Sequence, residues 1–540
     1  MTAAPIVWSH SPRPLSLSGS SIGESLVRHG ALLFWCLLLA HALVATVAPS
    51  VGFVTLPRDT LEGFLWGRSP QWGYFKHPPL QAWILGLSET LAPSAPWLAF
   101  LYAQICVIVT LWAVWRLASD VLGEAQGLVA AILTLAGVHY YGPSMATFTP
   151  DTLSAPLWAL TGLFWWRAVV RGRPLAWFAL ALVVALSVYA KYVGLLLAGV
   201  LAMLTLAVPA WRAELRRTEF WLALAIGIGL VTPHLRWMIQ TGFSSLSHAV
   251  SHEGVADSLL VRLGYCLEFL SGQLVQHTGL LLLVGLCIGH GRFRPRTELV
   301  VEGRTVPEAE RIAILVMALA PLAIALAVNF AVGGQFRQGR GTALFAFSGI
   351  AAVLLAGPVL RLGRLGPAAV FVLLVLFALP VANAGHHVVR LALGATHVPT
   401  LYPAESLAAQ LQERWRASTG LPLSVVAGDR WHAGNVAFYI DDPALILLDG
   451  NFAISPWLDR ATVERSGALL VWHPDDRAAL ANLRRLVPDL KPEGLVTASS
   501  PLPFGPPTTL AYRILPPASG PVESPSLPTD LPAELQGPEG

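Results

Sequence analysis

The chain has 540 residues, of which 54% are hydrophobic and only 12% charged, and its formal net charge is +3. Soluble domains carry about twice that charged fraction, so the composition excludes an ordinary soluble globular protein. Repeated apolar runs have the length of roughly 20 residues that a helix needs to cross a bilayer core. We therefore predict a polytopic α-helical protein, passing many times through the inner or plasma membrane, with membrane lipids around it and no nucleic-acid partner.

The first 29 residues are polar and precede the first apolar run, which we predict to be a retained membrane helix because no clear small-residue cleavage site follows it. About eleven membrane helices are expected. They lie near residues 30–49, 97–116, 125–142, 151–170, 175–190, 192–210, 220–239, 272–290, 312–332, 342–361 and 367–385.

Basic residues collect in the loops that follow the even-numbered helices. They are Arg167, Arg171, Arg173, Arg212, Arg216, Arg217, Arg292, Arg294, Arg296, Arg304, Arg311, Arg361 and Arg364. Loops rich in Lys and Arg stay on the cytoplasmic side. The N-terminus is therefore predicted to be cytoplasmic, and the loop at 50–96 and everything after residue 388 to be extracytoplasmic.

Four segments follow from this pattern: a cytoplasmic N-terminal segment at 1–29, a membrane domain at 30–388, an extracytoplasmic α/β domain at 389–515 and a disordered tail at 516–540. The α/β domain is predicted from short β-like runs that alternate with helical stretches. The β-like runs are Leu423–Ala427, Phe438–Ile440, Ala444–Leu448 and Ala468–Trp472. The tail is rich in Pro, Ser, Glu and Gly, a composition typical of disorder.

Acidic residues are scarce in the membrane half, so each one is informative. Asp59 and Glu62 follow the first helix and are three residues apart, which on a helical turn would place them on one face. Asp151 follows Pro150 at the outer start of a helix. The alternatives are that Asp151 caps its helix and that Asp59 and Glu62 are solvated loop residues.

Several cations are predicted on the same outer side. Lys76 and His77 precede two prolines, which stiffen the chain and hold these side chains in place. Lys191, Arg337 and Arg340 lie in outer turns, against the positive-inside pattern. Such cations suit a bound phosphate, and contact with lipid headgroups is the alternative.

The sequence has no Walker A motif and no Rossmann glycine pattern after a strand, so the common motifs that bind a soluble nucleotide are missing. It also has no HExxH motif. A carboxylate can act as a general base toward a hydroxyl, and cations can stabilise a departing phosphate. This combination indicates an enzyme acting on a lipid-linked phosphate. The alternative is a transporter or flippase of a lipid-linked or anionic substrate, for which we would expect repeated halves and ionisable residues near mid-helix.

The segment Trp72–Leu80, with the sequence WGYFKHPPL, resembles the membrane glycosyltransferases of the GT-C class, and the family 39 group in particular. That group includes protein O-mannosyltransferases and the aminoarabinose transferases of lipid A. The residues around Asp151, Lys191 and 233–237 are similar too, and the resemblance spans about residues 30–475. It implies hexosyl or pentosyl transfer from a polyprenyl-phosphate sugar donor to a lipid, glycan or protein acceptor outside the cytoplasm.

By this resemblance Asp59 is the general base, Asp151 and Glu62 are further active-site acids, and Lys76 and His77 bind the lipid phosphate. Lys191, Arg337 and Arg340 assist there. In the aminoarabinose enzymes a lysine stands where this chain has His77. Many family members have adjacent Asp and Glu, whereas here Thr60 follows Asp59. No metal ligand is therefore assigned, and the need for a divalent metal is left open.

Overall fold

The structure is a computed structural model that describes residues 15–16, 21–93, 95–137, 145–251, 258–287, 298–300, 304–335, 339, 341–356, 359–361 and 365–518. The chain divides into two units. Unit 1 comprises Met1–Tyr402 and Ser500–Pro506, and unit 2 comprises Pro403–Ser499 and Pro507–Gly540.

Unit 1 is mainly helical. Its first helices are α1 (Ser21–Gly52), α2 (Arg58–Gly67), α3 (Leu80–Leu91), α4 (Leu98–Leu122), α5 (Glu124–Leu135), α6 (Pro150–Trp165), α7 (Leu175–Ala190), α8 (Gly194–Ala207), α9 (Pro209–Arg212) and α10 (Thr218–Gln240). Then follow α11 (Ser244–Ser251), α12 (Leu259–Gln276), α13 (Thr278–Cys287), α14 (Glu308–Val332), α15 (Gly341–Leu344), α16 (Ser348–Ala356) and α17 (Leu365–Ala392). A small sheet joins β1 (Leu15–Ser16), β2 (Glu298–Val300) and β3 (Val359–Arg361).

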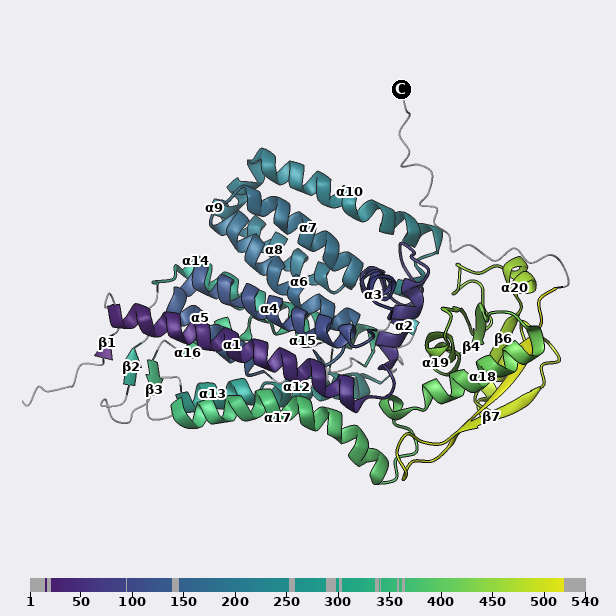
Figure 1. The fold of residues 1–540 in the computed structure, drawn as a ribbon. Coiled ribbons are helices and arrows are strands. Elements are labelled where there is room, and N and C mark those ends of the chain that lie inside the picture. Colours follow the sequence, from purple (N-terminus) through teal and green to yellow (C-terminus); the bar gives the residue numbers. More distant parts are fainter. Residues whose placement is uncertain are drawn as a thin grey trace, which may run out of the picture. The chain divides into compact units, whose positions relative to one another are not determined.

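The long helices of unit 1 lie side by side, with α4 and α6 in the middle (Figure 1). Helices α7 and α10 pack beyond α6 on one side, and α1 and α17 lie beyond α4 on the other. The core between them is apolar and includes the fully buried rings of Trp158, Trp166 and Phe347. Packing is close there, because a Cβ at Gly162 would lie 2.5 Å from the Phe347 ring.

Within the described residues, five helices are long and apolar enough to cross a membrane, and seven if each bent pair counts as one span. The predicted run at 192–210 is α8 followed by a bend of 103° at Val208. The predicted helix at 272–290 is instead the end of α12 and α13, which meet at an angle of 55°. The predicted run at 342–361 is broken between α15 and α16. The expected number of about eleven spans therefore remains a prediction.

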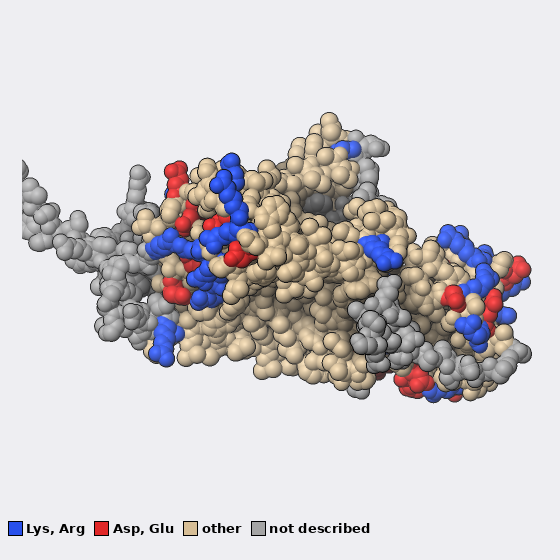
Figure 2. Space-filling view, turned by 90° about the horizontal axis from the view of Figure 1, so that it is seen from above, with Lys and Arg blue, Asp and Glu red and all other residues tan. Residues whose placement is uncertain are grey.

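Charged side chains gather toward the end of unit 1 where β1 lies, and the middle of the visible face is nearly free of them (Figure 2). Charged residues near helix ends make ion pairs with one another, such as Arg167 Nε with Asp120 Oδ2 at 2.7 Å and Arg217 Nε with Glu214 Oε2 at 2.6 Å. A broad uncharged surface on a helical bundle is what contact with lipid tails requires.

Unit 2 contains α18 (Ala404–Thr419), β4 (Val425–Gly428), α19 (His432–Tyr439), β5 (Leu445–Leu448), α20 (Arg460–Ser466), β6 (Ala468–Trp472), α21 (Arg477–Leu483), β7 (Gly494–Ala498) and β8 (Thr508–Leu515). The strand order is β5-β4-β6-β8-β7. Strands β4, β5 and β6 are parallel, and β8 and β7 add antiparallel pairs.

The parallel strands of unit 2 are buried and apolar, as expected when helices cover both faces of a sheet. Val425 and Ala427 of β4 join the core formed with α20 and α21, while α19 also packs against β4. The predicted strand at Phe438–Ile440 is wrong, because these residues form the end of α19 and its C-cap. The predicted tail lies outside the described residues apart from 516–518.

Candidate active site

Two of the predicted catalytic carboxylates lie in the first turns of α2. The carbonyl of Pro57, which precedes the helix, accepts its first backbone hydrogen bonds. Asp59 and Glu62 are three residues apart and share a face of the helix. Their environments differ, because the Asp59 side chain is 50% exposed and the Glu62 side chain only 3%.

Helices α2 and α3 cross at very close range. A Cβ at Gly67 would lie 2.4 Å from the carbonyl oxygen of Ala82, and one at Gly86 would lie 2.3 Å from the carbonyl oxygen of Gly67. Only glycine allows such an approach. An ion pair between Arg68 Nη2 and Glu89 Oε1, at 2.7 Å, adds a second tie. The two helices therefore form a firm support for the segment that connects them.

That connecting segment is held by an aromatic stack and a turn. The Tyr74 ring stacks on Trp66 with centroids 4.9 Å apart, and its hydroxyl donates to the Trp66 carbonyl at 2.8 Å. Burial raises the pKa of Tyr74, so the hydroxyl keeps the proton that it donates. The Tyr74 amide donates to the His77 carbonyl at 3.0 Å, and Gly73 lies against the ring of Trp237. The turn thus fixes the two residues between Tyr74 and His77, one of which is Lys76.

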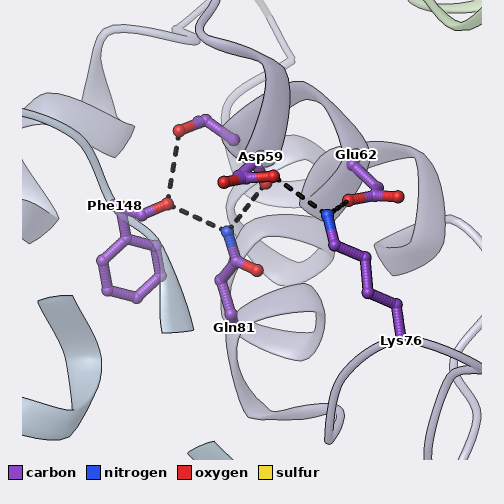
Figure 3. Close-up of polar contacts among 6 residues, drawn as sticks. Asp59, Glu62, Lys76, Gln81 and Phe148 are labelled. Carbon is purple, nitrogen blue, oxygen red and sulfur yellow. Dashed lines mark hydrogen bonds and ion pairs between the residues drawn. The ribbon is translucent and has the colours of Figure 1, made fainter. Parts of the chain in front are cut away.

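Lys76 bridges the two carboxylates of α2 (Figure 3). Its Nζ lies 3.0 Å from Asp59 Oδ1 and 2.6 Å from Glu62 Oε2. The Lys76 side chain is itself only 12% exposed. One ammonium therefore serves two carboxylates, of which one is buried and one is open to solvent.

Gln81 of α3 ties this helix to the segment before α6. Its Nε2 donates to the Asp59 carbonyl at 3.1 Å and to the Phe148 carbonyl at 2.9 Å (Figure 3). The Thr60 hydroxyl donates to the same Phe148 carbonyl at 3.3 Å. These bonds bring the second predicted outer loop alongside α2.

Asp151 lies in the first turn of α6 but does not cap it. Thr149 is the N-cap, since its Oγ1 accepts a hydrogen bond from the Thr152 amide at 3.2 Å. The Asp151 carboxylate instead forms an ion pair with the Lys191 ammonium, which comes from the turn between α7 and α8. The capping alternative from the sequence is therefore wrong for this residue.

His77 interacts electrostatically with both ion-paired groups. Its ring lies within electrostatic range of Lys76, Lys191, Asp59 and His248. Burial, and then the positive charges of the two lysines, hold the pKa of His77 well below its usual value. The imidazole is therefore neutral near pH 7, where it can offer a hydrogen bond but no charge.

A further network braces this site from α10, and sequence reasoning gave it no role there. His234 Nδ1 lies 2.6 Å from the carbonyl oxygen of Trp72, and its Nε2 lies 3.0 Å from the Tyr192 hydroxyl. That hydroxyl is 2.8 Å from Ser245 Oγ. A neutral His234 that donates from Nδ1 accepts from Tyr192 at Nε2. The sequence signals were the family resemblance at 233–237 and a polar side chain in an apolar helix.

The structure brings six of the predicted site residues together: Asp59, Glu62, Lys76, His77, Asp151 and Lys191. Arg337 and Arg340 lie outside the described residues. Among the residues that the structure describes, no group of three or more His, Cys, Asp or Glu side chains is arranged to hold a metal ion. The Lys76 ammonium contacts both α2 carboxylates, so the observed arrangement does not fit a divalent metal there.

Comparisons with known proteins agree on the class of fold. Residues 76–237 match a family model described as dolichyl-phosphate-mannose-protein mannosyltransferase. No curated protein matches the chain. The structure of ArnT from Cupriavidus metallidurans bound to undecaprenyl phosphate is similar, with a TM-score of 0.57 and 16% identity, over 89% of this chain and 98% of that one. Its apo structure has the same TM-score and coverage at 15% identity.

A more distant match is the oligosaccharyltransferase AglB from Archaeoglobus fulgidus in complex with an inhibitory peptide and a dolichol-phosphate. It has a TM-score of 0.37 and 10% identity, over 81% of this chain and 69% of that one. The family model and the ArnT fold together confirm the predicted resemblance to GT-C membrane glycosyltransferases of the family 39 type. The chain is accordingly an integral membrane protein with an ArnT-like fold.

Proposed function

We propose that the protein transfers a sugar from a polyprenyl-phosphate donor to a hydroxyl group of an acceptor outside the cytoplasm. The observation that carries this proposal is a pair of lysine–carboxylate groups, one at Lys76 and one at Lys191, whose lysines both interact electrostatically with His77. The match to a dolichyl-phosphate-mannose-protein mannosyltransferase family model supports it, and so does the similar fold of ArnT, which was solved with undecaprenyl phosphate bound. The acceptor is a lipid, a glycan or a protein.

In the proposed reaction the acceptor oxygen forms a bond to the anomeric carbon of the donor sugar. The bond between that carbon and the phosphate oxygen breaks, and its electron pair leaves with the polyprenyl phosphate. The acceptor proton passes to the Asp59 carboxylate as general base. Asp59 suits this task because its side chain is half exposed and so within reach of an acceptor.

The other residues have supporting roles in this proposal. Lys76 and Lys191 stabilise the negative charge that develops on the leaving phosphate. Glu62, which is buried against Lys76, and Asp151, which is paired with Lys191, hold these two ammonium groups in place. His77 contributes a hydrogen bond to the phosphate. Arg337 and Arg340 are proposed to assist the phosphate from the turn after α14.

The proposal places this site on the extracytoplasmic side, with the N-terminus cytoplasmic and unit 2 outside. It agrees with the positive-inside rule, because the arginines of the loops after α6 and α9 belong to the opposite face. The donor lipid can then stay in the membrane during the reaction, because its phosphate lies at headgroup level next to the site.

The test uses the purified full chain with undecaprenyl-phosphate sugars radiolabelled in the sugar and with extracted membrane acceptors. Wild-type protein is expected to move label to an acceptor, and Asp59→Asn to lose about 10²- to 10⁴-fold in rate, as removal of a general base does. Glu89→Gln, which breaks only the ion pair with Arg68 on the same helix pair, is the matched control and is expected to keep most activity. Full activity of Asp59→Asn would exclude it as the base.

The same preparation distinguishes the enzyme from a transporter. In liposomes, a transporter would move a lipid-linked substrate across the bilayer without consuming the sugar–phosphate bond. Consumption of the donor with transfer to an acceptor supports the proposal. Translocation with an intact donor would replace it with the transporter alternative.

A further inference from the structure

Lys76 is shared between two carboxylates of unequal exposure, and this inequality has a consequence for the lipid phosphate. The Glu62 contact is the shorter of the two, 2.6 Å against 3.0 Å, and Glu62 is 3% exposed. Separating a buried carboxylate from its cation is costly, because no water replaces the cation. Asp59 is 50% exposed, so water can take over its hydrogen bond to Lys76 at little cost. Asp59 is therefore the exchangeable partner.

The pair of carboxylates also makes the neighbourhood of Lys76 a poor place for a second anion. An ammonium has three N–H donors, and here two of them reach Asp59 and Glu62. A phosphate on the third donor would lie about 4 to 5 Å from the Asp59 carboxylate. At that range two like charges repel by about 3 to 4 kcal/mol near a protein surface.

We propose that the donor phosphate displaces Asp59 from Lys76, so that the base is released only when the donor is bound. This inference rests on the proposed function and specifies how its base is controlled. Lys76 keeps its buried partner Glu62 and exchanges the exposed Asp59 for the phosphate. An Asp59 carboxylate without the ammonium next to it accepts a proton from an acceptor hydroxyl more readily. Before the donor binds, the ion pair with Lys76 offsets the negative charge of the same carboxylate.

This exchange predicts an unusual change in the affinity for the lipid phosphate. Removing the catalytic base should improve the affinity for the lipid phosphate, because the phosphate no longer competes with Asp59 for Lys76. The probe is undecaprenyl phosphate itself, which carries no sugar and undergoes no turnover. Its dissociation constant is measured with the full chain in nanodiscs by isothermal titration, for wild type, Asp59→Asn, Lys76→Met and the double variant.

Asp59→Asn is expected to bind undecaprenyl phosphate about two- to fivefold more tightly than wild type, the value of a partly exposed ion pair. Lys76→Met is expected to bind about 10- to 100-fold more weakly, as the loss of a charged hydrogen bond requires. In the Lys76→Met background the Asp59→Asn change should have no effect on binding. This last result separates exchange at Lys76 from a general gain on removing negative charge, which would persist without the lysine.

Glu89→Gln removes a nearby carboxylate that does not touch Lys76 and should leave the affinity unchanged. Unchanged or weaker binding by Asp59→Asn, or tighter binding that survives in the Lys76→Met background, overturns the inference. Transfer activity without this coupling would retain the proposed function and reject the exchange. Coupling between Asp59 and Lys76 in donor binding, without any sugar transfer, would support the exchange and reject the proposed function.

Discussion

The helix-start aspartates of the two units are used in different ways. In unit 2, Asp459 and Asp476 each precede a helix, and each carboxylate accepts a hydrogen bond from an amide three residues on, at 2.6 and 2.9 Å. In unit 1, Asp59 and Asp151 also lie in the first turn of a helix, yet neither caps it. Their carboxylates pair with lysines from elsewhere in the chain.

In the proposed mechanism, this difference separates carboxylates that stabilise the fold from carboxylates that take part in the chemistry. A capping aspartate contributes about 1 kcal/mol to its own helix. At α6 that contribution comes from Thr149, which leaves Asp151 without a capping role. The pairing of an acid with a distant lysine, beside a residue that already performs the structural task, is the feature that marks the site.

Beyond the Asp59→Asn test described above, the largest effect that tests this comparison is expected for Asp151→Asn. Losing its carboxylate frees Lys191 to move, and a misplacement of about 1 Å at a reacting centre can cost 10²-fold in rate. We expect kcat/KM for sugar transfer to fall about 10- to 100-fold, with a change in unfolding free energy of about 1 kcal/mol or less, because the lost interactions are a partly exposed ion pair and the contact with the helix dipole. Transfer assays and thermal unfolding measure the two quantities.

Thr149→Ala provides the reverse control for Asp151→Asn. It removes the cap and should lower stability by about 1 kcal/mol while Asp151 and Lys191 remain paired. If Asp151→Asn kept full transfer activity but lost stability, Asp151 would belong with the structural aspartates of unit 2.

Much of the helical unit could be predicted from apolar runs, but its bends could not. Hydropathy depends on composition over about 19 residues, and neither the 103° bend after α8 nor the 55° bend at His277 changes that composition. The Phe438–Ile440 error has a related cause. Short apolar, aromatic runs fit a strand or a buried helix end equally well, and here contacts with α18 and β4 favour the helix.

The members of the site could be predicted individually, because acids and outer cations are rare in a membrane domain. Their partners could not. Lys76 is 14 residues from Glu62 and 17 from Asp59, and it lies beyond the end of α2, so no helical or strand period relates these residues. The pairing arises because Tyr74 stacks on Trp66 and turns the chain back over α2. His234 reaches Trp72 across 162 residues, which depends on the tertiary fold alone.

A smaller effect, and one of the opposite kind, is expected for Asp476→Ala in unit 2. The change removes the N-cap of α21 and should lower the local stability there by about 1 kcal/mol. Hydrogen exchange of the α21 amides in the full chain measures this loss, and transfer activity per folded molecule should not change. A large loss of activity with unchanged exchange would show that Asp476 is not only a capping residue.

The smallest effect concerns the acid dependence of unit 2 and depends on Asp429. Its Oδ1 accepts from the amides of Trp431 and His432, and its Oδ2 lies 2.9 Å from His432 Nδ1. Burial alone would raise the pKa of Asp429, but the hydrogen bonds and charge of His432 outweigh it and the pKa is lowered. A carboxyl group with a lowered pKa stabilises the fold above its unfolded value of about 3.9. That contribution disappears as the pH falls through the folded pKa.

His432→Gln removes the interactions that lower the pKa of Asp429. We expect the variant to be less stable than wild type at pH 6. The difference should close only as the pH falls from about 3.9, the unfolded pKa, through the lowered pKa that Asp429 has in the wild-type fold. Hydrogen exchange of the β4 amides between pH 6 and 3 follows both proteins. His473→Gln leaves the Asp429 hydrogen bonds intact and should show no such closing difference. If the stability difference between His432→Gln and wild type stayed constant with pH, His432 would act through packing. The lowered pKa of Asp429 would then come from the backbone amides that donate hydrogen bonds to its carboxylate.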